Sequence, residues 1–122
     1  MLVPLDAHDG LVFDSRNLLR MQGYLNPASF WEIVEDFRSA IEQRLCDLDK
    51  PNLSAGRVGH ICHDLLTLAG TLGLFELQAA AERLSNFKGN DRLPIEYTTA
   101  DVRNAGARAL SALSEYINAR NA

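Results

Sequence analysis

The chain has 122 residues, of which 47% are apolar, and 12 basic against 16 acidic residues give a formal net charge of −4. This length and composition fit a single domain over residues 1–122 with a packed core. No apolar run approaches the roughly 18 residues of a membrane span, and no basic cluster indicates nucleic-acid binding. No basic, apolar signal peptide is visible at the start, so we expect a cytoplasmic protein.

An irregular N-terminal arm is expected over residues 1–13, where Pro4 and Gly10 interrupt short apolar pieces. Asp14-Ser15 then offers an N-cap for a short helix, and Gly23 is a plausible stop. This helix is too short to be stable alone, so we expect it to pack on the rest of the domain.

A long amphipathic helix is expected over residues 27–49. Asn26-Pro27 is a strong start signal, because a capping side chain precedes a proline at the first helical position. Apolar residues then recur every three or four positions. Charged residues such as Arg44 fill much of the remaining surface, which is interpreted as solvated.

Three further helices complete the chain. The first runs from about residue 53 to 72, capped by Asn52 or Ser54, and the second from about 74 to 88, before Gly89. The stretch from Thr98 to Asp101 resembles a capping box and starts a final helix that ends near Arg120. No segment alternates with period two, so we expect an all-α, four-helix up-down bundle with a short N-terminal helix.

The helix over residues 53–72 places His63 opposite its apolar face. At about 100° per residue, one face collects the apolar side chains Val58, Ile61, Cys62, Leu65, Leu68, Ala69 and Leu72. His63 lies almost diametrically across from the centre of this face, and Leu66 lies between the two faces. If the helix packs on a core, His63 therefore faces solvent.

Glycines mark the histidine-bearing face of the same helix. Gly56, Gly59 and Gly70 share this face with His60 and His63. Each glycine inside a helix costs roughly 1 kcal/mol relative to alanine, and such local conflicts tend to mark functional or close-contact sites. The glycines would let another molecule approach the imidazole, or they would let a neighbouring helix of the same chain pack closely.

His63 is the main candidate for chemistry. A solvent-exposed imidazole is mostly neutral near pH 7 and is available as a nucleophile. No serine, cysteine or second carboxylate is spaced to form a hydrolytic triad with it. A helix-borne, solvent-facing histidine instead suits a group carrier whose partners supply the metal and the catalytic electrostatics. The alternative is a surface histidine of no significance.

The neighbouring polar residues have weaker functional readings. His60 and His63 stand three apart, but no further ligands follow at a metal-site spacing, so no metal site is predicted. Asp64 could polarise the imidazole or accept its proton, although such an acid is more often a solvated helix residue. Cys62 is interpreted as core and suits a reducing cytosol together with Cys46, although a disulfide between them stays open.

The run from His63 to Gly73, HDLLTLAGTLG, resembles the signature of histidine phosphotransfer (HPt) domains of multistep phosphorelays. Leu65, Ala69, Leu72 and Gly73 match that signature, and the layout of a leading helix and a four-helix bundle covers nearly the whole chain. The resemblance implies that His63 is the phosphoacceptor. Two positions depart from it, because Leu66 stands where the family has lysine and Thr67 where it has glycine.

The same run, His63-Asp64-Leu65-Leu66-Thr67, is also similar to the dimerisation box of sensor histidine kinases. There an acid follows the histidine and serves as a base, and threonine stands four places on. A kinase would also need a nucleotide-binding domain, for which the chain has no glycine-rich or strand-bearing region. A phosphotransferase of this kind would dimerise, whereas an HPt domain is usually a monomer.

The expected function is that of a phosphorelay carrier in a two-component system. The partners implied are a response-regulator receiver domain, a hybrid histidine kinase, or both, with Mg²⁺ supplied by the receiver and no cofactor of the chain's own. The predicted docking surface around His63 comprises Gly59, His60, Asp64, Leu66, Thr67 and Gly70. The alternative is a catalytically silent HPt-like module that binds and inhibits a receiver or kinase, and a plain structural bundle is a third reading.

Overall fold

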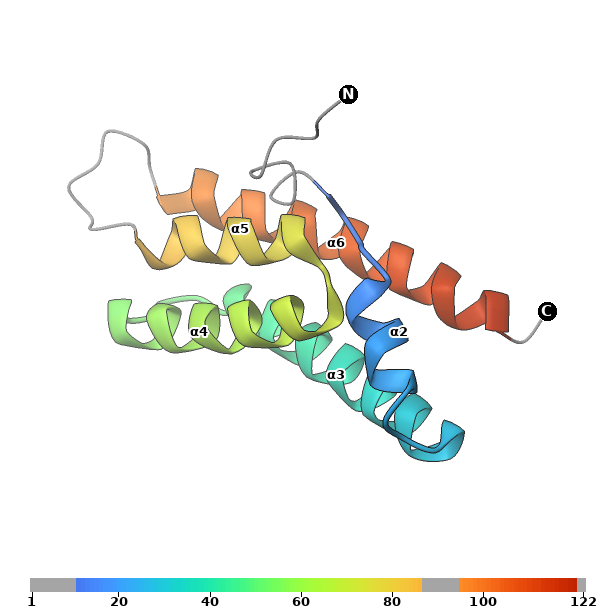
Figure 1. Ribbon diagram of the computed structural model, residues 1–122. Helices are drawn as coiled ribbons and strands as arrows, with labels where there is room; N and C mark the ends of the chain where they lie inside the picture. Colours follow the sequence, from blue (N-terminus) through green and yellow to red (C-terminus); the bar gives the residue numbers. More distant parts are fainter. Residues whose placement is uncertain (1–10, 87–94, 121–122) are drawn as a thin grey trace, which may run out of the picture.

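The computed structural model describes residues 11–86 and 95–120, and this part of the chain contains helices and no strands (Figure 1). Its five helices are α2 (Arg16–Gln22), α3 (Pro27–Leu48), α4 (Ala55–Leu72), α5 (Phe75–Ser85) and α6 (Ile95–Arg120). The predicted all-α class and the short leading helix are confirmed. Residues 11–14 precede α2 without helical structure, and the rest of the predicted arm lies outside the described residues.

The four long helices surround one apolar core. Consecutive long helices run in opposite directions (Figure 1), with α3 and α5 each in contact with both α4 and α6. The short α2 packs against α3 and α4. The largest side chains that are fully buried between them include Leu18, Phe30, Ile41, Ile61, Leu65, Leu72, Leu77 and Leu113. Within the described ranges, no helix combines the length and apolar character needed to cross a bilayer.

Polar side chains cap the starts of α3 and α4. The Asn26 side chain accepts a hydrogen bond of 2.8 Å from the Ser29 N–H, and proline occupies the first position of α3. Ser54 caps α4 by accepting a hydrogen bond of 3.1 Å from the Arg57 N–H. Of the two candidate caps for α4, the structure therefore selects Ser54. Both helices begin where short-range hydrogen-bonding chemistry predicts.

Gly73 ends α4 and contacts the segment of the chain that precedes α2. Its backbone is left-handed, with φ of 80°, and a side chain there would collide with the Asp14 carbonyl. The Asp14 N–H donates to the Gly73 carbonyl at 2.9 Å, and the Glu76 N–H donates to the Leu11 carbonyl at 2.7 Å. Asn17 on α2 adds a side-chain hydrogen bond of 3.0 Å to the Gly70 carbonyl. The residues before and within α2 thus fix the turn between α4 and α5.

The predicted start of the last helix is wrong. Helix α6 begins at Ile95, so the stretch from Thr98 to Asp101 lies within it and does not cap it. The Asp101 carboxylate instead accepts hydrogen bonds of 2.7 and 3.1 Å from Arg83 on α5. Asp101 therefore connects α6 to α5 and does not cap a helix. Helix α5 ends at Ser85, and the predicted stop at Gly89 lies outside the described residues.

Candidate functional site

The exposed His63 lies near the middle of α4. Ile61 and Leu65 on either side of it are fully buried, as is Leu72 farther along. Because these positions lie on one side of the helix, the histidine between them turns outward. The prediction that His63 faces solvent is confirmed. His60, one turn earlier, has a side chain that is 62% exposed.

The glycines of α4 have different surroundings. A methyl group added at Gly56 or Gly59 would meet nothing within 4 Å, so this part of the helix surface is bare. One added at Gly70 would come within 2.8 Å of the Gln78 amide nitrogen on α5. Gly56 and Gly59 therefore leave open surface, whereas Gly70 gives room to the end of the Gln78 side chain from α5.

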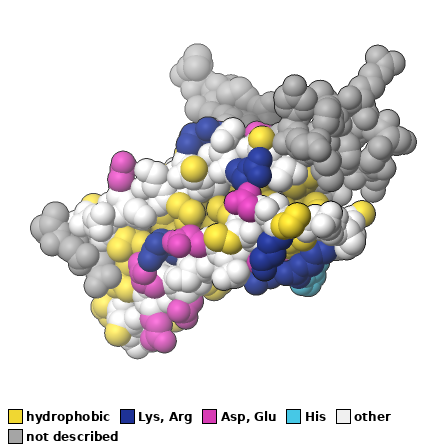
Figure 2. Space-filling view, turned by 180° about the vertical axis from the view of Figure 1, so that it is seen from behind, with side chains coloured by type: hydrophobic (Ala, Val, Ile, Leu, Met, Phe, Trp, Pro, Cys, Tyr) yellow, Lys and Arg dark blue, Asp and Glu magenta, His cyan; other side chains and the backbone are white. Residues whose placement is uncertain are grey.

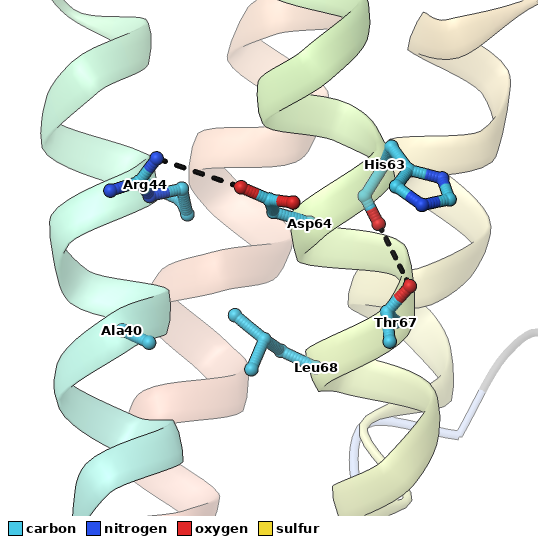
Figure 3. Close-up of a pocket in the computed structure, with 6 residues that line it drawn as sticks. All are labelled: Ala40, Arg44, His63, Asp64, Thr67 and Leu68. Carbon is cyan, nitrogen blue, oxygen red and sulfur yellow. Dashed lines mark hydrogen bonds and ion pairs between the residues drawn. The ribbon is translucent and has the colours of Figure 1, made fainter.

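A groove of about 420 Å³ runs between α3 and α4 beside the histidine (Figure 3). Its lining residues are Ala40, Arg44, His63, Asp64, Thr67 and Leu68. Ala40 and Leu68 provide its apolar part, and the charged side chains lie toward the N-terminal end of α4. Three of the predicted site residues, His63, Asp64 and Thr67, thus share one depression.

Asp64 faces α3 and not the imidazole of its sequence neighbour. Its carboxylate lies 3.6 Å from a terminal nitrogen of Arg44 and 3.8 Å from Nε2 of His60. Figure 3 shows the carboxylate directed toward Arg44 and the His63 ring directed to the opposite side of α4. In this arrangement Asp64 contacts Arg44, and it is not positioned to take a proton from the His63 ring.

The two positions that depart from the HPt signature differ in exposure. Thr67 is exposed, and its hydroxyl donates a hydrogen bond of 3.1 Å to the His63 backbone carbonyl (Figure 3). The hydroxyl is thus used within the helix and does not reach the imidazole. Leu66 is half-buried and packs against the core. Leu66, which belongs to the predicted docking surface, is therefore partly covered by packing within the chain.

A basic cluster surrounds the buried Asp47 at the adjoining end of α3. Lys50, Arg57 and Arg44 approach its carboxylate at 3.0, 3.4 and 3.6 Å, and Gln43 donates to it at 3.2 Å. The Lys50 hydrogen bond is the main cause that lowers the pKa of Asp47 below its ordinary value, against the opposing effect of burial. Figure 2 shows basic side chains gathered beside a histidine on one face of the molecule.

The cysteines and acids near the site form neither a disulfide nor a metal centre in the described ranges. Cys46 is exposed and Cys62 is buried, and both are free thiols. Burial raises the pKa of the Cys62 thiol to about 11. No group of three or more His, Cys, Asp or Glu side chains gathers in a metal-binding arrangement among the residues described.

Arg44 is the residue that sequence reasoning missed. Its place on an amphipathic helix indicates solvated surface, yet Arg44 lines the groove and pairs with Asp64 on the next helix. Its sequence signal is weak, since any charged residue on an amphipathic helix looks the same. The antiparallel pairing of α3 and α4 could have drawn attention to it, because their shared turn brings the end of α3 beside the first half of α4.

The chain matches no protein-family model, and comparisons with curated proteins and with solved structures also found no match. The chemistry of the α4 surface and the residues around it therefore carry the functional proposal.

Proposed function

We propose that this protein is a histidine phosphotransfer carrier of a two-component phosphorelay, with His63 as the phosphoacceptor. The single observation that carries the proposal is an exposed histidine on α4 with the bare surface of Gly59 one turn away. The opposed directions of the four long helices agree with an up-down bundle of the HPt kind. The run from His63 to Gly73 supplies the resemblance to that family.

The proposed reaction moves a phosphoryl group between an aspartate of a receiver domain and His63. A neutral imidazole nitrogen attacks phosphorus, the bond from phosphorus to the aspartyl oxygen breaks, and the aspartate regains its carboxylate. The other ring nitrogen then loses its proton to water. The return step onto a second receiver reverses these bond changes, and Mg²⁺ held by the receiver offsets the charge on the phosphoryl oxygens.

The proposed docking surface is the exposed side of α4 around His63. His60 and Thr67 are exposed on this side, and the groove beside Asp64 adds a depression next to it. Gly59 lets a partner approach the helix backbone closely. Leu66 and Gly70 also belong to the predicted surface, but their contacts within the chain give them smaller roles in docking than the exposed residues.

The test is incubation with phosphorylated receiver domains encoded in the same genome. We expect acid-labile, base-stable label on the wild-type chain and none on His63→Gln. His8→Gln is the matched control, because it makes the same substitution at a histidine that is not part of the predicted docking surface. Label that persists in His63→Gln, or the absence of label with every receiver, would refute the proposal.

A second candidate function is a silent HPt-like module that binds and inhibits a receiver or kinase. Thr67 favours it, because an exposed β-branched side chain stands one turn from His63 where the family has glycine. In that case a receiver or kinase would bind equally well to His63→Ala, and no label would form. Thr67→Gly distinguishes the two functions: faster labelling indicates a carrier that threonine obstructs, and no labelling indicates the silent module.

A further inference from the structure

We infer that Arg44 on α3 is the phosphoryl-binding cation of this site, kept at the edge of the groove by a loose ion pair with Asp64 until the phosphoryl group arrives. This inference rests on the proposed phosphotransfer function. Leu66 is uncharged where the HPt signature has lysine. Arg44 on the preceding helix supplies a positive charge in its place. This arrangement also gives Asp64 a role, namely to position the guanidinium over the groove.

The first support is the groove itself. Arg44, Asp64 and His63 line one depression of about 420 Å³ between α3 and α4 (Figure 3). A water molecule occupies roughly 30 Å³ in the liquid, so the depression has room for a tetrahedral phosphoryl group and several waters. The Arg44 side chain is 26% exposed, which leaves its guanidinium accessible from the groove.

The second support is how loosely Arg44 is held. Its Nε lies 3.6 Å from Asp47, and a terminal nitrogen lies 3.6 Å from Asp64. Both distances exceed hydrogen-bond length. By contrast, Arg38 and Arg108 lie 2.6 and 2.7 Å from their carboxylates. A phosphoryl group would therefore offer Arg44 short, charge-assisted hydrogen bonds that its present partners do not provide.

The third support is the charge balance after transfer. A phosphoryl group brings about −1.5 to −2 charges at neutral pH, and the Asp64 carboxylate is carried by the next residue along α4. Without a cation, these like charges would repel each other. The guanidinium, with five N–H donors, can face both anions at once. Arg44 thereby offsets the repulsion that the sequence His63-Asp64 would otherwise create.

One rearrangement connects the resting structure to the phosphorylated one. The His63 ring points away from the groove in Figure 3, so it must rotate about its Cα–Cβ bond to bring the phosphoryl group toward Arg44. Helices accept two of the three staggered rotamers at this bond. Exposed side chains exchange rotamers on the picosecond to nanosecond timescale. The rotation is therefore no barrier on the timescale of phosphotransfer.

The experiment uses phosphoramidate as a chemical donor, so that no receiver is needed. The phosphorus–nitrogen bond of the donor breaks, a bond forms from phosphorus to the imidazole, and ammonia leaves with the imidazole proton. The ionisation of the phosphoryl group on His63 is then followed by ³¹P NMR against pH in wild type, Arg44→Gln and Arg44→Lys. Arg38→Gln is the matched control, since it removes the same charge from α3 at a side chain that is 30% exposed.

We expect Arg44→Gln to raise the phosphoryl titration midpoint by about half a pH unit, because a nearby cation favours the more charged form. Arg44→Lys should keep most of the wild-type value, and Arg38→Gln should match wild type. Label on His63 with an unchanged midpoint in Arg44→Gln would overturn this inference and leave the carrier function intact. No label on the wild-type chain from phosphoramidate or from any receiver would overturn both.

Discussion

Gly59 lies within α4 and Gly73 ends that helix, and opposite physical reasons explain the absence of a side chain at each. Gly59 has open space around it, so nothing within the described chain requires a glycine there. Gly73 has a left-handed backbone that abuts the carbonyl of Asp14. Because no contact within the described residues explains the glycine at position 59, we connect Gly59 with an external partner. This contrast leads to two predictions of opposite sign.

We predict that Gly59→Ala stabilises the protein by about 0.5 to 1 kcal/mol, because alanine is the better helix former and its methyl group meets no neighbour. Urea unfolding followed by circular dichroism measures the change. If Gly59 serves docking, Gly59→Leu should in addition slow phosphotransfer from a receiver while labelling by phosphoramidate stays normal. A destabilised Gly59→Ala variant would contradict the open surroundings of this residue.

Gly73→Ala, in contrast, should lower the free energy of unfolding by at least about 2 kcal/mol. The left-handed conformation costs a non-glycine residue of this kind roughly 1 to 2 kcal/mol, and the methyl group also collides with backbone at Asp14. The same urea titration measures it. An unchanged unfolding midpoint would mean that the leading segment does not pack against the turn between α4 and α5.

At the scale of the elements, Asp47 connects the end of α3 to the start of α4. Its buried carboxylate faces Lys50 from the following turn and Arg57 from α4. Because the folded chain lowers the pKa of this carboxyl group, its contribution to stability is fully present above the ordinary aspartate value of about 4. The contribution is lost as the pH falls through the lower, folded-state value.

We therefore predict that Asp47→Asn weakens the acid dependence of stability. The difference in unfolding free energy between wild type and variant should be largest near neutral pH and should shrink as the pH falls below about 4. Asp49→Asn is the matched control, because this aspartate is two residues away, exposed, and paired with Arg103 on α6. Equal pH dependence in the Asp47→Asn and wild-type chains would contradict the lowered pKa.

At the scale of the whole molecule, the reactivity of the two thiols distinguishes the surface of the protein from its core. Cys46 is exposed, whereas Cys62 is buried in the core with its pKa raised to about 11. Since the thiolate is the reactive form, Cys46 should react with an aromatic disulfide reagent in the native state. In a Cys46→Ser variant, Cys62 should react only at the rate at which the core opens. Rapid native-state reaction of Cys62 would show that the core is not closed over it.

Local chemistry determines what the sequence could predict about this fold. The starts of α3 and α4 follow from capping side chains next to them in sequence, and the end of α4 follows from Gly73. Exposure of His63 follows from helix periodicity. The misplaced start of α6 has a different cause, since Asp101 hydrogen-bonds to Arg83 on another helix and does not serve as a local cap. Distant partners of this kind leave no pattern in a single sequence.

The candidate site likewise combines features that local sequence determines with features that depend on distant residues. Helix periodicity placed the histidine and its neighbouring glycines, but it could not tell Gly59 from Gly70, because the Gln78 side chain that meets Gly70 belongs to α5. The contact between Arg44 and Asp64 depends on the alignment of α3 against α4. Residues that form the site through a second helix became visible only once the helices were assembled.

The backbone links from Leu11 and Asp14 to the turn after α4 have a mechanical consequence. They anchor the helix that carries His63 at its far end, while Ser54 and the ionic contacts of Asp47 anchor its beginning. A partner that docks on α4 would therefore bind a helix that is already ordered, because the entropy of ordering this helix was lost when the chain folded. Selectivity among docking partners would then come from how well each one fits the fixed surface of α4, and not from rearrangement of α4 after binding.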